Sequence, residues 1–147
     1  MPQKDIYSGY RCVIVTMTEE SGLELNMICE SAVIAETFNK FLESLSQRFR
    51  RRPLALFMDQ LSVHRAIAVK PTYQKLDILP VYNVSYSPQF NPIEAVFSKL
   101  KAHFSRQRLH NLVNKLGFNA DRQIKTALTK ITQRHCAACA RKSFHLL

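Results

Sequence analysis

Acidic residues are scarce in this chain, tryptophan is absent, and hydrophobic runs are short. Eleven Asp and Glu stand against 21 Lys and Arg among 147 residues, which gives a formal net charge of +10. No apolar run approaches the roughly 18 residues of a membrane-spanning helix, and the first residues lack the apolar core of a signal peptide. Four cysteines are too few for a disulfide scaffold. These absences favour a soluble intracellular protein of a reducing compartment, not a secreted one.

The composition of the chain predicts a folded domain with a basic C-terminal part. Hydrophobic residues make up 46% of the chain, which is enough to bury a core at a length that suits one ordinary domain. Up to Glu94 ten acidic residues balance ten basic ones, whereas eleven basic residues and a single acid, Asp121, follow it. The excess positive charge therefore belongs to the last third of the chain and predicts a polyanionic partner.

Seven cations in this basic end are candidate contacts to a nucleic-acid backbone. Four lie along and after the helix expected at Glu94, and three share one face of a predicted final helix: Lys99, Lys101, Arg106, Arg108, Lys130, Arg134 and Arg141. The alternative is an ordinary solvated face, but the near absence of acids favours phosphate contact. Membrane-surface binding fits less well, because the late helices lack an aromatic-rich apolar face.

The hydrophobic pattern predicts a mixed α/β fold. Two strands form a hairpin, a helix follows, and two further strands alternate with helices before a helical C-terminal end. In the second hairpin strand Leu23, Leu25 and Met27 are expected on one face. The expected strands are 11–18, 23–30, 54–58 and 78–84. The last strand is expected at a sheet edge or to be irregular, because it contains Pro80. The expected helices are 32–47, 65–75, one from 91, a short one at 111–116 that ends at Gly117, and one from 120.

Asp59 is the first candidate functional residue, because it ends the wholly apolar run 54–58. Such a run is typical of a central strand buried on both faces, and open α/β sheets bind ligands at the carboxyl ends of their strands. The alternative is a carboxylate that caps the loop after the strand.

Glu94 is the second candidate, in the sequence Asn91-Pro92-Ile93-Glu94. Asn at the N-cap, Pro at the first helical position and Glu at the third form a capping arrangement. That structural role is the alternative to a functional one, although a carboxylate in the first helical turn can serve both.

Two segments together resemble a known family. Residues 86–94 read YSPQFNPIE and continue as AVFSKLK, similar to the YSP-x-x-NPIE-x-x-(W/F)-S-x-L-K signature of mariner-related transposases of the DDE superfamily. Residues 58–66, MDQLSVHRA, resemble that family's (L/V)-D-N-A-x-x-H-x-A segment. Asp59 then falls at the family's second acidic position and Glu94 at its third, with the family's usual 34 residues between them. Gln60 and Leu61 depart from the pattern.

This resemblance implies an RNase H-like fold over residues 1–110, and the charge and hydrophobic pattern predict a basic helical extension over 111–147. The resemblance also implies metal-dependent DNA cleavage and strand transfer, in DNA transposition and integration, by three carboxylates that hold two divalent cations, Mg²⁺ or Mn²⁺. Such sites suit oxygen ligands and phosphodiester chemistry. The implied partner is DNA, with a homo-oligomer in the transposition complex and no membrane.

The first acidic position of the family has no clear counterpart, since Asp5 does not lie on an apolar strand. We therefore expect a fragment that lacks the first central strand and is inactive alone. The alternative is a non-catalytic DNA-binding module derived from a transposable element.

Three further features of the sequence have two interpretations each. His64 lies in the Asp59 segment and is either near the site or an exposed residue of a helix start. The run Arg48 to Arg52 is more typical of a solvated loop than of a nucleic-acid contact. Cys136 and Cys139 resemble half of a zinc site, with His135 and His145 nearby, but two buried thiols are the favoured interpretation.

Overall fold

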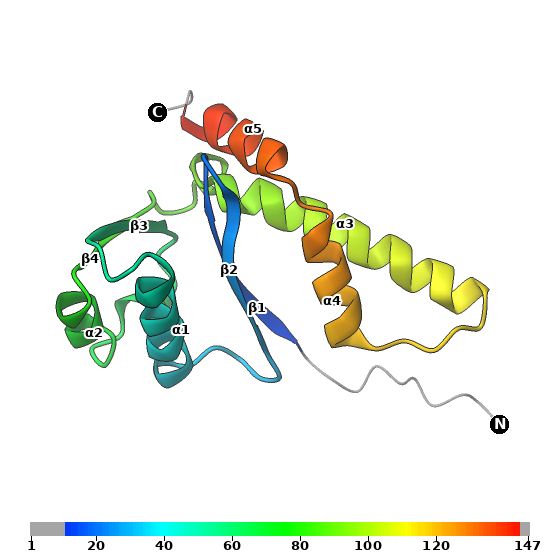
Figure 1. Cartoon of the computed structure of the whole chain (residues 1–147), viewed down its shortest axis with the longest axis horizontal. Coiled ribbons are helices and arrows are strands. Elements are labelled where there is room, and N and C mark those ends of the chain that lie inside the picture. The colour runs from blue at the N-terminus through cyan, green and yellow to red at the C-terminus, as the bar shows by residue number, and fades with distance from the viewer. Residues whose placement is uncertain (1–10, 145–147) are drawn as a thin grey trace.

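The computed structural model describes residues 11–144 and contains two small sheets surrounded by helices (Figure 1). Strands β1 (Cys12–Thr18) and β2 (Gly22–Cys29) pair antiparallel, and β3 (Leu54–Met58) and β4 (Ile78–Tyr82) pair parallel. The helices are α1 (Ala35–Arg48), α2 (Lys70–Lys75), α3 (Pro92–Val113), α4 (Ala120–Thr129) and α5 (Gln133–Phe144). The predicted mixed α/β fold with a helical C-terminal part is confirmed.

The hairpin contains a β-bulge that the sequence pattern did not predict. Thr16 pairs with Leu25 and the next residue, Met17, pairs with Leu23, so Glu24 is the extra residue in β2. A bulge interrupts the alternation of side chains between faces. Leu23 consequently packs on the C-terminal helices, whereas Leu25 and Met27 pack against α1. The prediction that these three side chains share one face was wrong for Leu23.

The first core cluster joins α1 to the parallel strand pair. Phe38, Phe41 and Leu42 of α1 pack there with Met58 and Ile78. The predicted second helix is split into a 3-10 turn, η1 (Ser62–Arg65), and α2, with Pro71 in the first turn of α2. Proline is tolerated at that position because its missing N–H would have no partner inside the helix.

Strand β3 has the predicted bounds but not the predicted burial. Only Met58 is buried, and within residues 11–144 β3 pairs with one strand, β4. The expectation of a strand covered on both faces was therefore wrong in the described structure. Pro80 does lie in a strand with one pairing partner, as predicted.

The C-terminal part is organised differently from the prediction. The helix that begins after Asn91 continues to Val113, so the first half of the separate segment expected at 111–116 belongs to it. The predicted division between 110 and 111 falls inside α3. The predicted final helix is two helices, since α4 ends at Thr129 and α5 begins at Gln133. Figure 1 shows α4 and α5 against the hairpin and the first half of α3, with the second half projecting away.

The break before α5 has a local cause at Thr132. Its hydroxyl accepts a hydrogen bond from the backbone N–H of His135 at 3.3 Å, and its own N–H donates to Nδ1 of His135 at 3.2 Å. This reciprocal pair is a capping box in which histidine replaces the usual Glu or Gln.

No helix among the described residues is long and apolar enough to cross a membrane.

Candidate active site

Asp59 follows the last residue of β3 and is held by the 3-10 turn η1. Nδ1 of His64 lies 3.0 Å from the Asp59 carboxylate oxygen Oδ1 and 3.0 Å from the Asp59 backbone oxygen. Because both neighbours are hydrogen-bond acceptors, Nδ1 carries the proton. The His64 side chain is 15% exposed, and the Asp59 side chain is 40% exposed. Asp59 is thus oriented by a half-buried histidine and remains open to solvent.

His64 is itself fixed by its neighbours. Its ring lies over Phe38 of α1, with ring centroids 4.8 Å apart. Its backbone oxygen accepts hydrogen bonds from the hydroxyls of Tyr73 at 2.9 Å and Tyr82 at 3.1 Å. Burial raises the pKa of the Tyr73 hydroxyl well above its ordinary value, so this donor keeps its proton at neutral pH. Of the two interpretations left open for His64, the structure shows the position beside Asp59.

Glu94 stands in the first turn of α3, three residues after its N-cap. The Asn91 side-chain oxygen accepts a hydrogen bond from the Ile93 N–H at 3.3 Å, and Asn91 is only 4% exposed. The predicted capping arrangement is present, but the Asn91 backbone N–H donates to the Pro88 carbonyl and not to Glu94. The cap therefore fixes the backbone that carries Glu94, and the Glu94 carboxylate is not the reciprocal partner of a capping box.

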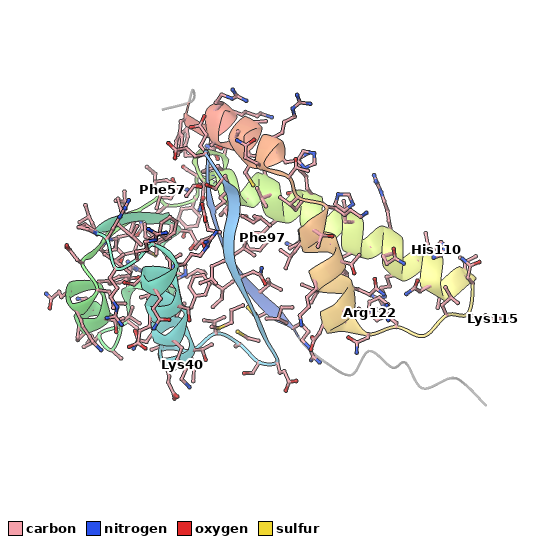
Figure 2. All side chains as sticks on the ribbon, in the orientation of Figure 1. Lys40, Phe57, Phe97, His110, Lys115 and Arg122 are labelled. Carbon is pink, nitrogen blue, oxygen red and sulfur yellow. The ribbon has the colours of Figure 1, made fainter. Side chains whose placement is uncertain are left out.

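The fold brings Asp59 and Glu94 to the same two hollows. The first, which we call the central cavity, has a volume of about 520 Å³ and lies between β1 and β3, with side chains of α1, α3 and α5 around it. The second, the outer pocket, has a volume of about 490 Å³ and lies between the loops after β3 and β4. Both carboxylates line both hollows. Figure 2 labels Phe57 and Phe97, two of the rings around the central cavity.

Asn83 is a site residue that the sequence reasoning missed. It follows β4, is 5% exposed, and its side-chain N–H donates to the Ser87 carbonyl at 2.7 Å. Its side-chain oxygen accepts from the Val84 N–H at 2.8 Å, and Gln60 donates to its backbone oxygen at 2.8 Å. These bonds tie the loop after Asp59 to the loop that leads into α3. A polar residue directly after an apolar strand was the signal that could have found it.

A comparison with protein-family models matches residues 4–116 to a family described as DDE superfamily endonuclease. The chain belongs to the DDE superfamily of endonucleases. The resemblance identified from the sequence is thereby confirmed at the level of the family. A comparison with curated protein sequences gives no match.

Solved structures of a mariner transposase share the fold of this DDE-superfamily chain. The catalytic domain of Mos1 transposase with Raltegravir and Mg matches at a TM-score of 0.65 and 16% identity, over 89% of this chain and 68% of that one. The Mos1 strand transfer complex matches at a TM-score of 0.67 and 17% identity, over 97% of this chain and 42% of that one. The Mos1 catalytic domain alone matches at a TM-score of 0.63 and 16% identity, over 89% of this chain and 67% of that one. The chain therefore covers only part of each.

The DDE chain places two carboxylates beside one cavity where a divalent cation could bind. Oxygen ligands, with water and phosphate completing the shell, are what Mg²⁺ prefers, and Asp59 and Glu94 border one cavity. Within residues 11–144, however, no group of three Asp, Glu, His or Cys side chains could enclose an ion. The two carboxylates fit a cation site that needs at least one further protein ligand. Asp5 lies outside the described residues.

The predicted phosphate-binding cations of the DDE chain are all exposed, but they do not form one surface. On α3, Lys99 and Arg106 are seven residues apart and share one side, while Lys101 and Arg108 share nearly the opposite side. Lys130 is the C-cap of α4, whereas Arg134 and Arg141 belong to α5. The prediction that these last three share one helix face was wrong, because the chain bends between them. His110 and Lys115, labelled in Figure 2, mark the far end of α3.

Cys136 and Cys139 lie inside the protein. Both are buried, and they pack with Val96 and Ile131. Burial raises the pKa of the Cys136 thiol, with a smaller contribution from Cys139. A raised pKa disfavours the thiolate that zinc requires. The favoured interpretation of two buried thiols agrees with this packing, and His145 lies outside the described residues.

Proposed function

We propose that this chain is part of the catalytic domain of a transposase that cleaves and joins DNA strands with the help of divalent cations. The observation that carries the proposal is the convergence of Asp59 and Glu94 on one cavity, although 34 residues separate them in the sequence. Membership of the DDE superfamily supports it, as does the fold shared with Mos1 transposase, whose structures contain Mg or Mn.

Asp59 and Glu94 would hold the cation, and the chain's other residues would position them. His64 fixes Asp59 through the contact of its Nδ1 with the carboxylate, and the Asn91 cap fixes the start of the helix that carries Glu94. Mg²⁺ is the proposed ion, with Mn²⁺ as its substitute, and when bound it would stabilise the charge that develops at a phosphodiester. DNA would approach over the exposed cations of the C-terminal helices.

We further propose that the chain is inactive by itself. Two carboxylates rarely position both ions of a two-ion site, and the described residues offer no third ligand beside Asp59 and Glu94. Assembly into a multimeric DNA complex is part of the same proposal, supported by the paired-end complexes in which Mos1 transposase has been solved. A nuclear or bacterial cytoplasmic location would follow from such a role.

Metal binding tests the site directly. Titration of the 147-residue protein with Mn²⁺ in a calorimeter should show a weak saturable site that both Asp59→Asn and Glu94→Gln abolish. Asp77→Asn is the matched control, because Asp77 is an exposed carboxylate whose backbone, not its side chain, bonds to Leu54. Equal Mn²⁺ binding by all three variants would contradict the proposed site.

A nicking assay tests the proposed inactivity. Supercoiled plasmid incubated with the protein and Mg²⁺ should stay intact. Nicking that Asp59→Ala removes would overturn the inactivity while supporting the site. The alternative function, a DNA-binding module without catalysis, predicts instead that DNA is bound equally with and without metal and that Asp59→Asn changes nothing.

A further inference from the structure

The four cysteines of this chain fall into two pairs with different surroundings. Cys12 is the first residue of β1 and Cys29 is the last residue of β2, and both are partly exposed. Cys136 and Cys139 stand three residues apart on α5, and both are buried. Neither pair takes part in the proposed metal site or in the proposed DNA contacts.

The register of the hairpin places Cys12 directly opposite Cys29. The two residues are Cα partners, and two positions further along β1 Ile14 is the partner of Met27. Side chains alternate between the two faces of a strand, so Cys12 shares a face with Ile14, and Cys29 shares a face with Met27. Ile14 and Met27 both pack against the first core cluster. The two thiols therefore lie on the same face of the hairpin.

The separation of directly opposed residues suits a disulfide. Their Cα atoms in an antiparallel pair are about 4.5–5.5 Å apart, which lies inside the roughly 4.4–6.8 Å found between disulfide-bonded cysteines. Burial raises the pKa of the Cys29 thiol, and Cys12 adds to the rise, which indicates that the two thiols are close to each other. The residue before Cys12, Arg11, contacts Asp121 of α4 through Nε and Oδ1 at 2.7 Å. This ion pair holds the end of the hairpin that carries both thiols.

The two cysteines of α5 do not have this geometry. Residues three apart on a helix have Cβ atoms about 5–6 Å apart, whereas a disulfide brings the Cβ atoms to about 3.5–4.5 Å. Cys136 and Cys139 could be joined only by distorting the helix, and both are buried. The α5 pair is therefore an internal control for the hairpin pair.

We infer that Cys12 and Cys29 form a site of reversible oxidation, at which a low-molecular-weight disulfide such as oxidised glutathione converts the two thiols into a cross-strand disulfide. One cysteine thiolate attacks the glutathione disulfide, forms a mixed disulfide and expels one glutathione thiolate. The other cysteine loses its proton, attacks the cysteine sulfur of the mixed disulfide and expels the second glutathione thiolate. The two protons lost by the cysteines are taken up by the two glutathione thiolates, so one disulfide is reduced as the other forms.

The cross-link would join the open end of the hairpin, opposite its turn. Cys12 also lines the central cavity, as do Asp59 and Glu94, so oxidation would fix the start of β1 at the wall of that cavity. A reducing compartment keeps such a pair as thiols, and a more oxidised glutathione pool shifts the pair toward the disulfide. A single reversible cross-link of this kind is compatible with a chain too poor in cysteine for a disulfide scaffold.

Mass spectrometry of the 147-residue protein in glutathione redox buffers tests the site. The samples are quenched with acid, alkylated in denaturant and digested without reductant. Oxidised glutathione should give a monomeric protein with a Cys12–Cys29 disulfide, while Cys136 and Cys139 are recovered as alkylated thiols. The equilibrium constant for this oxidation should be at least about tenfold larger in the folded protein than in urea, because a cross-link that fits the native structure is favoured by folding. The oxidised protein should also melt about 5–10 °C higher than the reduced one.

Substitutions separate the two pairs. Cys12→Ser and Cys29→Ser should each retain glutathione as a stable mixed disulfide on the remaining hairpin cysteine. Cys136→Ala with Cys139→Ala is the matched control and should form the hairpin disulfide as the unsubstituted protein does.

Three results with the unsubstituted protein, which need no variant, would overturn the inference. They are equal oxidation constants in the folded and unfolded protein, a mixed disulfide with glutathione that persists at Cys12 or Cys29, and a disulfide between two chains. The assay contains neither metal nor DNA, so its outcome is independent of the proposed metal site.

Discussion

At the scale of single residues, His64 decides how Asp59 is presented. The sequence left open whether the two are close, although the family segment contains both, and it could not show the contact of Nδ1 with the carboxylate oxygen at 3.0 Å. That contact depends on the 3-10 turn η1 and on Phe38, which belongs to a different helix. Gln60 illustrates the same limit, because its bond to the Asn83 carbonyl joins loops 23 residues apart.

We expect His64→Ala to weaken Mn²⁺ binding by about tenfold, because partners that orient a metal ligand typically contribute that much or more. His64→Asn should restore most of the affinity, since its amide N–H occupies nearly the position of Nδ1–H. Calorimetric titration of both variants gives the comparison, and thermal unfolding of each shows whether lost packing on Phe38 contributes. Wild-type Mn²⁺ affinity in His64→Ala would exclude a positioning role.

At the scale of elements, the sequence located the strands well and the late helices poorly. Strand bounds follow short apolar runs between turn residues, and these signals are local. The break between α4 and α5 depends on a capping box in which His135 takes the place of Glu or Gln, so the usual signature was absent. Gly117 was expected to end a separate short helix, whereas α3 itself continues to Val113 and the left-handed residue after it is Lys115, with φ of 53°.

The hairpin turn gives an element-scale prediction at Gly22. Its φ is +86°, and a Cβ built there would lie 2.9 Å from the Cα of Gln133, a backbone atom that cannot move alone. Gly22→Ala should lower the free energy of unfolding by about 1–2 kcal/mol from the backbone conformation alone, and by more from the clash with α5. Urea unfolding followed by circular dichroism measures the change.

Gly117→Ala is the matched control for that substitution. A Cβ at Gly117 would meet nothing within 4 Å. Its unfolding free energy should stay level or rise by up to about 1 kcal/mol, because alanine reduces the freedom of the unfolded chain. If Gly22→Ala were as stable as Gly117→Ala, the close packing of the hairpin turn on α5 would be wrong.

At the scale of the whole molecule, the charge is divided between two regions. The acids match the bases through Glu94, and the helices after it carry the excess. Because the chain bends between α4 and α5, and because α3 bears cations on two sides, this charge surrounds the helices instead of forming a single stripe. Binding of a polyanion should then depend on salt more than on any one side chain.

We expect DNA affinity to fall steeply with salt, and Arg134→Glu with Arg141→Glu to reduce the slope of log K against log salt by about 2. Arg52→Glu with Lys70→Glu changes the net charge equally but lies in the balanced region, and should change the slope less. Filter binding of an arbitrary DNA duplex over a range of salt concentrations measures both. Equal slopes for the two double variants would mean that net charge alone governs binding.

The sequence by itself determined the family, the two acidic candidates, the cap at Asn91 and the strand bounds. These depend on residue identity and on local spacing, which do not change with how distant segments pack. Only the tertiary structure decided that Asp59 and Glu94 share a cavity, that Leu23 turns away from Leu25, and that β1 and β3 border the same cavity. Those features arise from packing between distant segments, and sequence periodicity does not record which edges meet.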